Sequence, residues 1–116
     1  MTAPITTHVL DTAIGRPAAG VRATLERAVS SGDFAKIGEG VTDVDGRIKS
    51  LLAPGALVPG DYRLTFAVGA YFAAQQRPAF FARIPIEFTI DAAAAAQHYH
   101  VPLLLSPFGY TTYRGS

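Results

Sequence analysis

The sequence contains no cysteine in its 116 residues, which excludes disulfide bonds and thiolate chemistry. Charged residues are also scarce, at 16%, and the ten Lys and Arg against nine Asp and Glu form no basic run. Tight nucleic-acid binding relies on a clustered positive surface, so we expect no nucleic-acid partner. No apolar stretch approaches the ~20 residues of a membrane span, and residues 1–8 lack the basic and apolar segments of a secretory signal. We therefore expect a cytoplasmic protein with no membrane partner.

Apolar residues, by contrast, make up 49% of the chain. A domain of this size buries only about two thirds of the surface of its unfolded chain, so part of the apolar excess is expected in a subunit contact. The length suits one domain with its own core, spanning residues 1–116. The sequence therefore predicts a single-domain homo-oligomer.

Short segments of alternating apolar and polar residues recur along the chain and predict an all-β protein. The Asp45-Gly46 pair is a strong signal for a tight turn, because Gly accepts a positive φ at little cost. One helix is expected at 71–76, which lacks β-branched residues and precedes Pro78, and the alanines at 92–96 are read as a connection with about one helical turn. The expected strands, with a turn at 11–15, cover 6–10, 21–27, 34–41, 62–68, 84–90, 98–105 and 110–114. Their spacing is typical of a β-sandwich.

Four apolar rows are expected to face the core, because successive side chains of a strand point to opposite sides. They comprise Val21, Ala23 and Leu25; Tyr62, Leu64, Phe66 and Val68; Ile84, Ile86, Phe88 and Ile90; and Tyr99, Val101, Leu103 and Leu105. His98 and His100 lie on the opposite face from the last of these rows. That histidine face is therefore expected to look outward, into solvent or a neighbouring subunit.

Two histidines at i and i+2 can bind a metal, but the chain has one further histidine and no acidic residue at a ligand-like spacing nearby. We therefore expect no metal site. A single histidine in a strand, such as His8, is most often exposed or hydrogen-bonded within the core. An arginine directly after a turn, such as Arg47, is most often a solvated residue at the end of a loop. The alternation of side chains along the strands therefore indicates a site but does not identify the reaction.

Four separated motifs resemble those of one known family. They are Thr-His-Val-Leu-Asp-Thr at 7–12, Asp-Gly-Arg-Ile at 45–48, His-Tyr-His-Val-Pro-Leu-Leu-Leu-Ser-Pro at 98–107 and Tyr-Arg-Gly-Ser at 113–116. The family is that of the 5-hydroxyisourate hydrolases, the transthyretin-related enzymes of urate breakdown. The last motif is similar to the C-terminal tetrapeptide of these enzymes, which transthyretin itself lacks.

The resemblance implies an all-β, transthyretin-like sandwich of two four-stranded sheets with one short helix. It also implies a homotetramer, a dimer of dimers, with sites in a channel between the dimers. By the family pattern the catalytic residues are His8, Arg47 and His100. The implied substrate-binding residues are Tyr113, Arg114, Ser116 and, as a neighbour on the same strand face, His98.

The implied reaction is hydrolysis of 5-hydroxyisourate to 2-oxo-4-hydroxy-4-carboxy-5-ureidoimidazoline, without a metal or organic cofactor. His8 and His100 would share water activation and proton delivery, because imidazole titrates near neutral pH. Arg47 would orient the substrate and stabilise the oxyanion. Tyr113 would pack on the ring or hydrogen-bond to it, and Arg114 with Ser116 would complete the pocket.

Two other functions compete with this interpretation. A transthyretin-like carrier would bind a small hydrophobic ligand in the same channel. The channel of a carrier is expected to be largely apolar, whereas His8, His100 and Tyr113 would make this one polar. A structural β-sandwich module would use its histidines in subunit contacts only, which leaves Arg47 unexplained.

Overall fold

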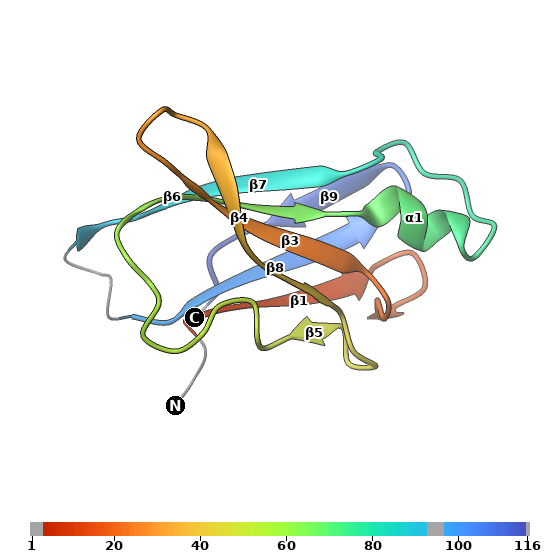
Figure 1. Cartoon of the computed structure of the whole chain (residues 1–116). Coiled ribbons are helices and arrows are strands. Elements are labelled where there is room, and N and C mark those ends of the chain that lie inside the picture. The colour runs from red at the N-terminus through yellow and green to blue at the C-terminus, as the bar shows by residue number, and fades with distance from the viewer. Residues whose placement is uncertain (1–3, 93–96, 116) are drawn as a thin grey trace.

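The computed structural model describes residues 4–92 and 97–115 and shows two packed β-sheets with one short helix (Figure 1). The all-β sandwich expected from the sequence is therefore confirmed. Ser116 and residues 93–96 of the alanine segment lie outside the described residues. The elements are β1 (Ile5–Asp11), β2 (Arg16–Pro17), β3 (Arg22–Ala28), β4 (Phe34–Val41), β5 (Arg47–Ile48), β6 (Gly60–Phe66), α1 (Val68–Ala73), β7 (Ile84–Ile90), β8 (Tyr99–Ser106) and β9 (Gly109–Thr112).

The two sheets differ in how their strands are joined. One has the order β4-β3-β6-β7 with all pairs antiparallel, and it has the expected four strands. The other has the order β2-β1-β8-β9, with β5 also paired to β1, so the expected count of four is wrong for this sheet. The difference arises because two short segments, each of two residues, pair with β1. β1 and β8 are parallel, which places the N-terminal strand beside a strand from the end of the chain.

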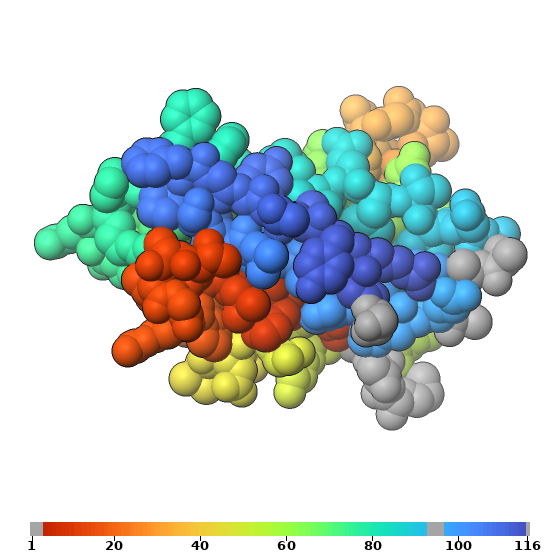
Figure 2. Space-filling model, turned by 180° about the vertical axis from the view of Figure 1, so that it is seen from behind, coloured from red at the N-terminus to blue at the C-terminus, as the bar shows by residue number. Residues whose placement is uncertain are grey.

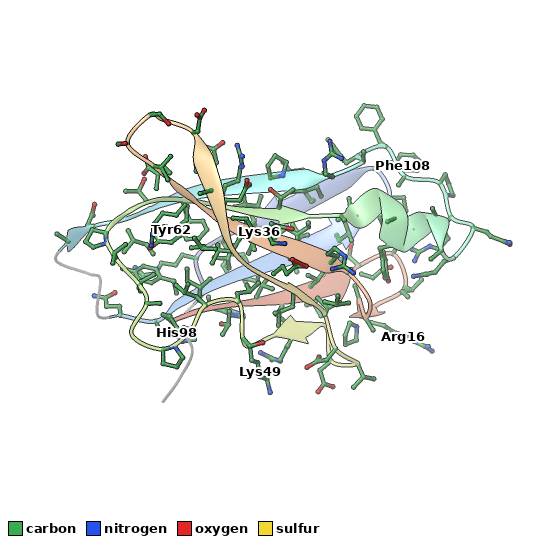
Figure 3. The ribbon with its side chains drawn as sticks, viewed as in Figure 1. Arg16, Lys36, Lys49, Tyr62, His98 and Phe108 are labelled. Atoms are coloured by element: carbon green, nitrogen blue, oxygen red, sulfur yellow. The ribbon has the colours of Figure 1, made fainter. Side chains whose placement is uncertain are left out.

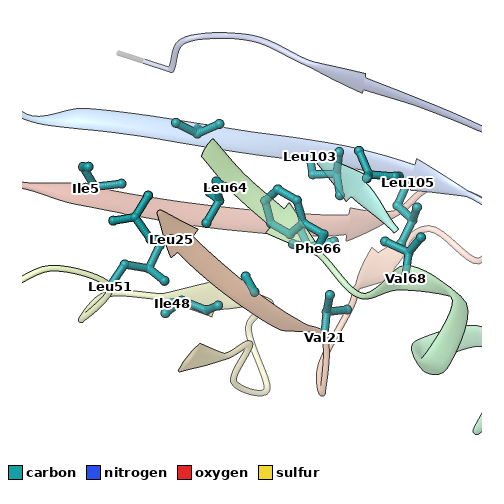
Figure 4. Packing of buried hydrophobic residues seen from close by; sticks show 14 of the residues in the cluster. Ile5, Val21, Leu25, Ile48, Leu51, Leu64, Phe66, Val68, Leu103 and Leu105 are labelled. Atoms are coloured by element: carbon teal, nitrogen blue, oxygen red, sulfur yellow. The ribbon is translucent and has the colours of Figure 1, made fainter. Parts of the chain in front are cut away.

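The apolar rows predicted by alternation meet between the sheets (Figure 4). Every member of the rows in β3, β6 and β8 is buried, as are Val21, directly before β3, and Val68, the first residue of α1. In β7 the outer members Ile84 and Ile90 are buried, whereas Ile86 and Phe88 are half-buried. β7 is an edge strand, so no further strand covers the middle of its row.

The helix begins earlier than the sequence predicts and ends at Ala73, so the expected range of 71–76 is wrong. Val68, Tyr71 and Phe72 form its buried face at the helical spacing of three and four residues. Burial of this face outweighs the β-branching of Val68, which had favoured a strand. Gln76 then takes a φ of 56°, a left-handed conformation that stops the helix.

The end of β1 is anchored by a buried carboxylate. Asp11 belongs to the strand, so the turn expected at 11–15 begins one residue later. Its side chain is 0% exposed and forms an ion pair with Arg77 Nη1 at 2.7 Å. The hydroxyl of Tyr71 donates a second hydrogen bond to Asp11 Oδ2 at 2.8 Å. This network fastens the helix region to the sheet that carries the histidines.

Within the described residues, no helix is long and apolar enough to cross a membrane.

Candidate active site

β1 lies between β5 and β8, and this order gathers the predicted catalytic residues on one sheet face. His8 is the pairing partner of Arg47 in β5. On the other side of β1, Thr6 is paired with His100 and His8 with Pro102. Residues directly opposite on neighbouring strands have side chains on the same face. Arg47, His8 and His100 therefore share the outer face of this sheet, which we call the histidine face.

The histidine face lies on the surface shown in Figure 2, where β1, β8, β9 and the region of β5 adjoin one another. His8 and His100 are half-buried, whereas His98 and Arg47 are exposed. Figure 3 shows the side chain of His98, which directly precedes β8. The outward face predicted for His98 and His100 is therefore confirmed.

The tight turn predicted at Asp45-Gly46 positions Arg47. The Asp43 carboxylate accepts hydrogen bonds from the backbone N–H groups of Asp45, at 2.9 Å, and of Arg47, at 3.0 Å. Gly46 has a φ of 76°, and a Cβ there would lie 2.4 Å from the carbonyl oxygen of Val9. Only glycine therefore allows this close approach to β1. The backbone hydrogen bond from Arg47 lowers the pKa of Asp43, which keeps the carboxylate ionised as the acceptor that orders the turn.

The Thr6 hydroxyl links two of the histidines. Its Oγ1 lies 2.9 Å from His98 Nε2 and 2.8 Å from His100 Nδ1. Alternation predicted an outward face for His98 and His100, but not that the strand containing Thr6 lies beside them. Thr6 is thus a residue of the site that alternation did not identify.

The surroundings of His100 favour its neutral form. Burial lowers its pKa, and the nearby charges of Arg47, His8 and His98 lower it further. His100 is therefore unprotonated at neutral pH and can accept a proton.

The C-terminal segment runs beside β8 beyond the end of β9. Thr112 is paired with Leu103, and Gly115 forms a bridge with His100. The antiparallel register between β9 and β8 therefore continues unchanged as far as Gly115. The Gly115 N–H donates a hydrogen bond to the His100 carbonyl at 2.7 Å. A Cβ at Gly115 would lie 2.6 Å from His100 Cδ2. Glycine at this position therefore lets the chain pass directly over the imidazole ring, a second contact that alternation did not predict.

The same register separates the two predicted substrate-binding residues of this segment. Tyr113 falls opposite Pro102, on the histidine face, and is 56% exposed. Arg114 falls on the other face, where its guanidinium carbon lies 4.5 Å from the centroid of the Tyr99 ring. Its Nη2 donates to Gln97 Oε1 at 2.7 Å. The structure thus brings Tyr113 to the histidines and directs Arg114 away from them.

Among residues 4–92 and 97–115, no group of three or more His, Cys, Asp or Glu side chains is placed to hold a metal ion. The His98 and His100 rings, with centroids 6.5 Å apart, are instead joined through Thr6.

Residues 5–115 match the family model described as the HIUase/Transthyretin family. The chain belongs to the HIUase/Transthyretin family. Among its relatives, the 5-hydroxyisourate hydrolase of Salmonella dublin is 47% identical over 112 residues, which cover 97% of this chain and 80% of the relative. This confirms the family to which the four sequence motifs pointed.

Solved structures of the HIUase/Transthyretin fold resemble the chain over most of its length. Sea bream transthyretin in complex with thyroxine is 32% identical with a TM-score of 0.91, covering 97% of this chain and 94% of that one. Klebsiella pneumoniae 5-hydroxyisourate hydrolase is 38% identical with a TM-score of 0.80, covering 97% and 98%. Because a transthyretin and a hydrolase both share the backbone, the side chains of the site must distinguish between their functions.

Proposed function

We propose that this chain hydrolyses 5-hydroxyisourate, adding water to open its six-membered ring. The observation that carries the proposal is the convergence of Arg47, His8 and His100 on one sheet face. The Salmonella dublin relative, named for this activity, supports the choice of substrate. The substrate is a small planar molecule rich in oxygen, which suits a site made of imidazoles and a guanidinium group.

In the proposed reaction, His100 and His8 share the proton transfers. One imidazole accepts a proton from water as the water oxygen attacks a ring carbonyl. The adjacent ring C–N bond then breaks, the carbonyl carbon becomes a carboxyl group, and the released nitrogen takes up a proton. Arg47 orients the substrate oxygens and stabilises the negative charge that develops on the attacked carbonyl oxygen.

Of the other residues predicted to contact the substrate, only Tyr113 has structural support among the described residues. Tyr113 is on the histidine face and is proposed to pack against the substrate ring. Arg114 stacks on Tyr99 and binds Gln97 in the single chain, so its contact with substrate remains a prediction. The contact predicted for Ser116 also remains so, because that residue lies outside the described part of the chain.

We further propose that the chain forms one domain and assembles as a dimer of dimers in the cytoplasm. The histidine face is an open sheet surface, whereas small-molecule sites are concave. A second copy placed against this face would enclose the substrate. The absence of cysteine is compatible with a reducing compartment.

The alternative function is a carrier of a small hydrophobic ligand in the channel between dimers. The TM-score of 0.91 with a thyroxine complex favours it at the level of the backbone. The half-buried histidines and the adjacent arginine make the histidine face polar, which favours the hydrolase.

The decisive experiment follows the absorbance of 5-hydroxyisourate, freshly made by oxidation of urate, with and without the protein. The hydrolase accelerates its loss in proportion to protein concentration. A carrier or a structural module leaves the spontaneous rate unchanged, and that result would overturn the proposed function.

The pH dependence of the reaction follows from the surroundings of His100. Its lowered pKa means that the base is lost only when the pH falls below the ordinary histidine value of about 6.5. We expect kcat/KM to remain high at neutral pH and to decline on the acid side of that value. A pH–rate profile measured with a saturating and a limiting substrate concentration tests this. An acid limb centred above the ordinary value would contradict it.

Gly115→Ala is expected to lower kcat at least about tenfold, because its methyl group would displace the His100 ring from its working position. The matched control is Gly109→Ala, at the start of β9, where the nearest atom to a new Cβ is Ser106 Oγ at 3.8 Å. The midpoint temperatures of thermal unfolding of the two variants should agree within a few degrees. Equal activities of the two variants would show that the close approach at Gly115 has no role in the reaction.

A further inference from the structure

A single hydroxyl group lies between two imidazole rings on the histidine face. Thr6 Oγ1 is within hydrogen-bond distance of His98 Nε2, at 2.9 Å, and of His100 Nδ1, at 2.8 Å. Thr6 is half-buried in β1, His100 is half-buried in β8, and His98 is exposed. The three groups therefore form a continuous path from the site to solvent.

The number of protons in this path restricts its arrangements. A hydroxyl donates one hydrogen bond and accepts two, and a neutral imidazole has one N–H. If Thr6 donates to His98 Nε2, it accepts from the N–H at His100 Nδ1, and His100 Nε2 then carries a lone pair. If Thr6 instead donates to His100 Nδ1, the proton of His100 lies on Nε2. The first arrangement leaves His100 Nε2 as a base, and the second leaves it as a donor.

We propose that Thr6 is a positioning residue that holds His100 as a base at Nε2 and relays protons between His100 and His98. The proposal rests on the proposed hydrolase function. When His100 Nε2 takes a proton from the attacking water, the Nδ1 proton of His100 passes to Thr6 Oγ1. The Thr6 hydroxyl proton passes at the same time to His98 Nε2. The positive charge is then on His98, and the reverse shift restores Nδ1–H as Nε2 gives its proton to the released nitrogen.

The charges around the path favour this direction. The groups that face His100 are His8 from β1, Arg47 from β5 and His98 directly before β8, while the C-terminal segment presents the backbone of Gly115. Burial and these neighbours all oppose a positive charge on His100. His98 is exposed, so water solvates the charge there. This role differs from the substrate contact that the family resemblance implied for His98.

The test compares Thr6→Val, which has the same shape but no hydroxyl, with Thr6→Ser, which keeps the hydroxyl. We expect Thr6→Val to lower kcat about tenfold to a hundredfold, the usual cost of losing the group that orients a functional imidazole. KM should change little, and Thr6→Ser should recover most of the activity. Thr24→Val, at a half-buried position of β3 on the other sheet, is the matched control and should keep the activity of the unmodified chain.

Two further measurements separate a relay from a merely structural role. Nitrogen NMR of the histidine rings should show Nδ1–H at His100 in the unmodified chain and in Thr6→Ser, and a mixture of tautomers in Thr6→Val. Adding His98→Gln to Thr6→Val should cause little further loss, because the first change already interrupts the path. Unchanged tautomers in Thr6→Val, or additive losses in the double variant, would overturn the proposal. The NMR result does not depend on turnover, so it remains distinct from a failure of the hydrolase assay.

Discussion

His100→Ala is expected to reduce the turnover of 5-hydroxyisourate by about 10²-fold or more, the usual contribution of a general acid–base group. His8→Ala and Arg47→Ala should cause losses of the same order. All three side chains lie on the outer face of the sheet, opposite the buried rows of β1 and β8. Their truncation therefore leaves the core packing intact. Steady-state kinetics on folded protein, with the assembly state checked by light scattering, measure the effect.

Lys49→Ala provides the control for loss of a cation near the site. Lys49 is exposed and follows Arg47 by two residues (Figure 3), so the substitution removes the same charge from the same segment. Its activity should stay near that of the unmodified chain. Arg47→Lys keeps the charge but loses the forked donor geometry and should recover only part of the activity. Near-normal turnover in His100→Ala would remove His100 from the mechanism.

Asp11→Ala is expected to lower the free energy of unfolding by about 3 kcal/mol, within the range for breaking a buried ion pair. The substitution leaves Arg77 without its carboxylate partner and removes the acceptor of the Tyr71 hydroxyl. The side chain of Arg77 is 21% exposed, so water offsets only part of this loss. Urea denaturation followed by circular dichroism measures the change.

The effect of Asp11 should depend on pH in a defined direction. Burial by itself raises the pKa of Asp11, but the hydrogen bonds from Arg77 and Tyr71 together lower it below the ordinary value. The carboxylate therefore contributes stability above the unfolded pKa of about 3.9, and this contribution is lost as the pH falls through the lower folded value. The difference between the unmodified chain and Asp11→Ala should thus shrink in acid.

Glu39→Ala is the matched control for this prediction. Glu39 pairs with two basic residues, Arg22 and Lys36, but both pairs are exposed. Exposed ion pairs contribute little to stability, so this variant should unfold close to the unmodified chain. Equal losses in Asp11→Ala and Glu39→Ala would show that burial of the Asp11 pair is unimportant.

Much of the fold follows from local sequence patterns. The buried rows of β3, β6 and β8 were predicted completely, because side-chain alternation is a property of each strand by itself. The same rule placed His100 on an outward face, whereas it left the direction of the His8 face open. The turn at Asp45-Gly46 was also predictable, because glycine accepts the positive φ that this turn requires.

Long-range contacts account for what the patterns missed. The helix start at Val68 was missed because burial of its apolar face overrides local propensity. The buried hydrogen bonds of Asp11 were not predicted, because its partners are 60 and 66 residues away in the chain. Thr6 was missed for the same reason, since its hydroxyl meets His100 across 94 residues.

The sequence by itself determined which side chains of a strand share a face and where the chain turns, since both depend on backbone geometry over a few residues. The motifs also determined the family. Only the tertiary structure decided that β1 lies between β5 and β8, which sets His8 beside Arg47 and Thr6 beside His100. Strand order and register depend on which distant segments bury their apolar faces together, and no local period specifies that choice.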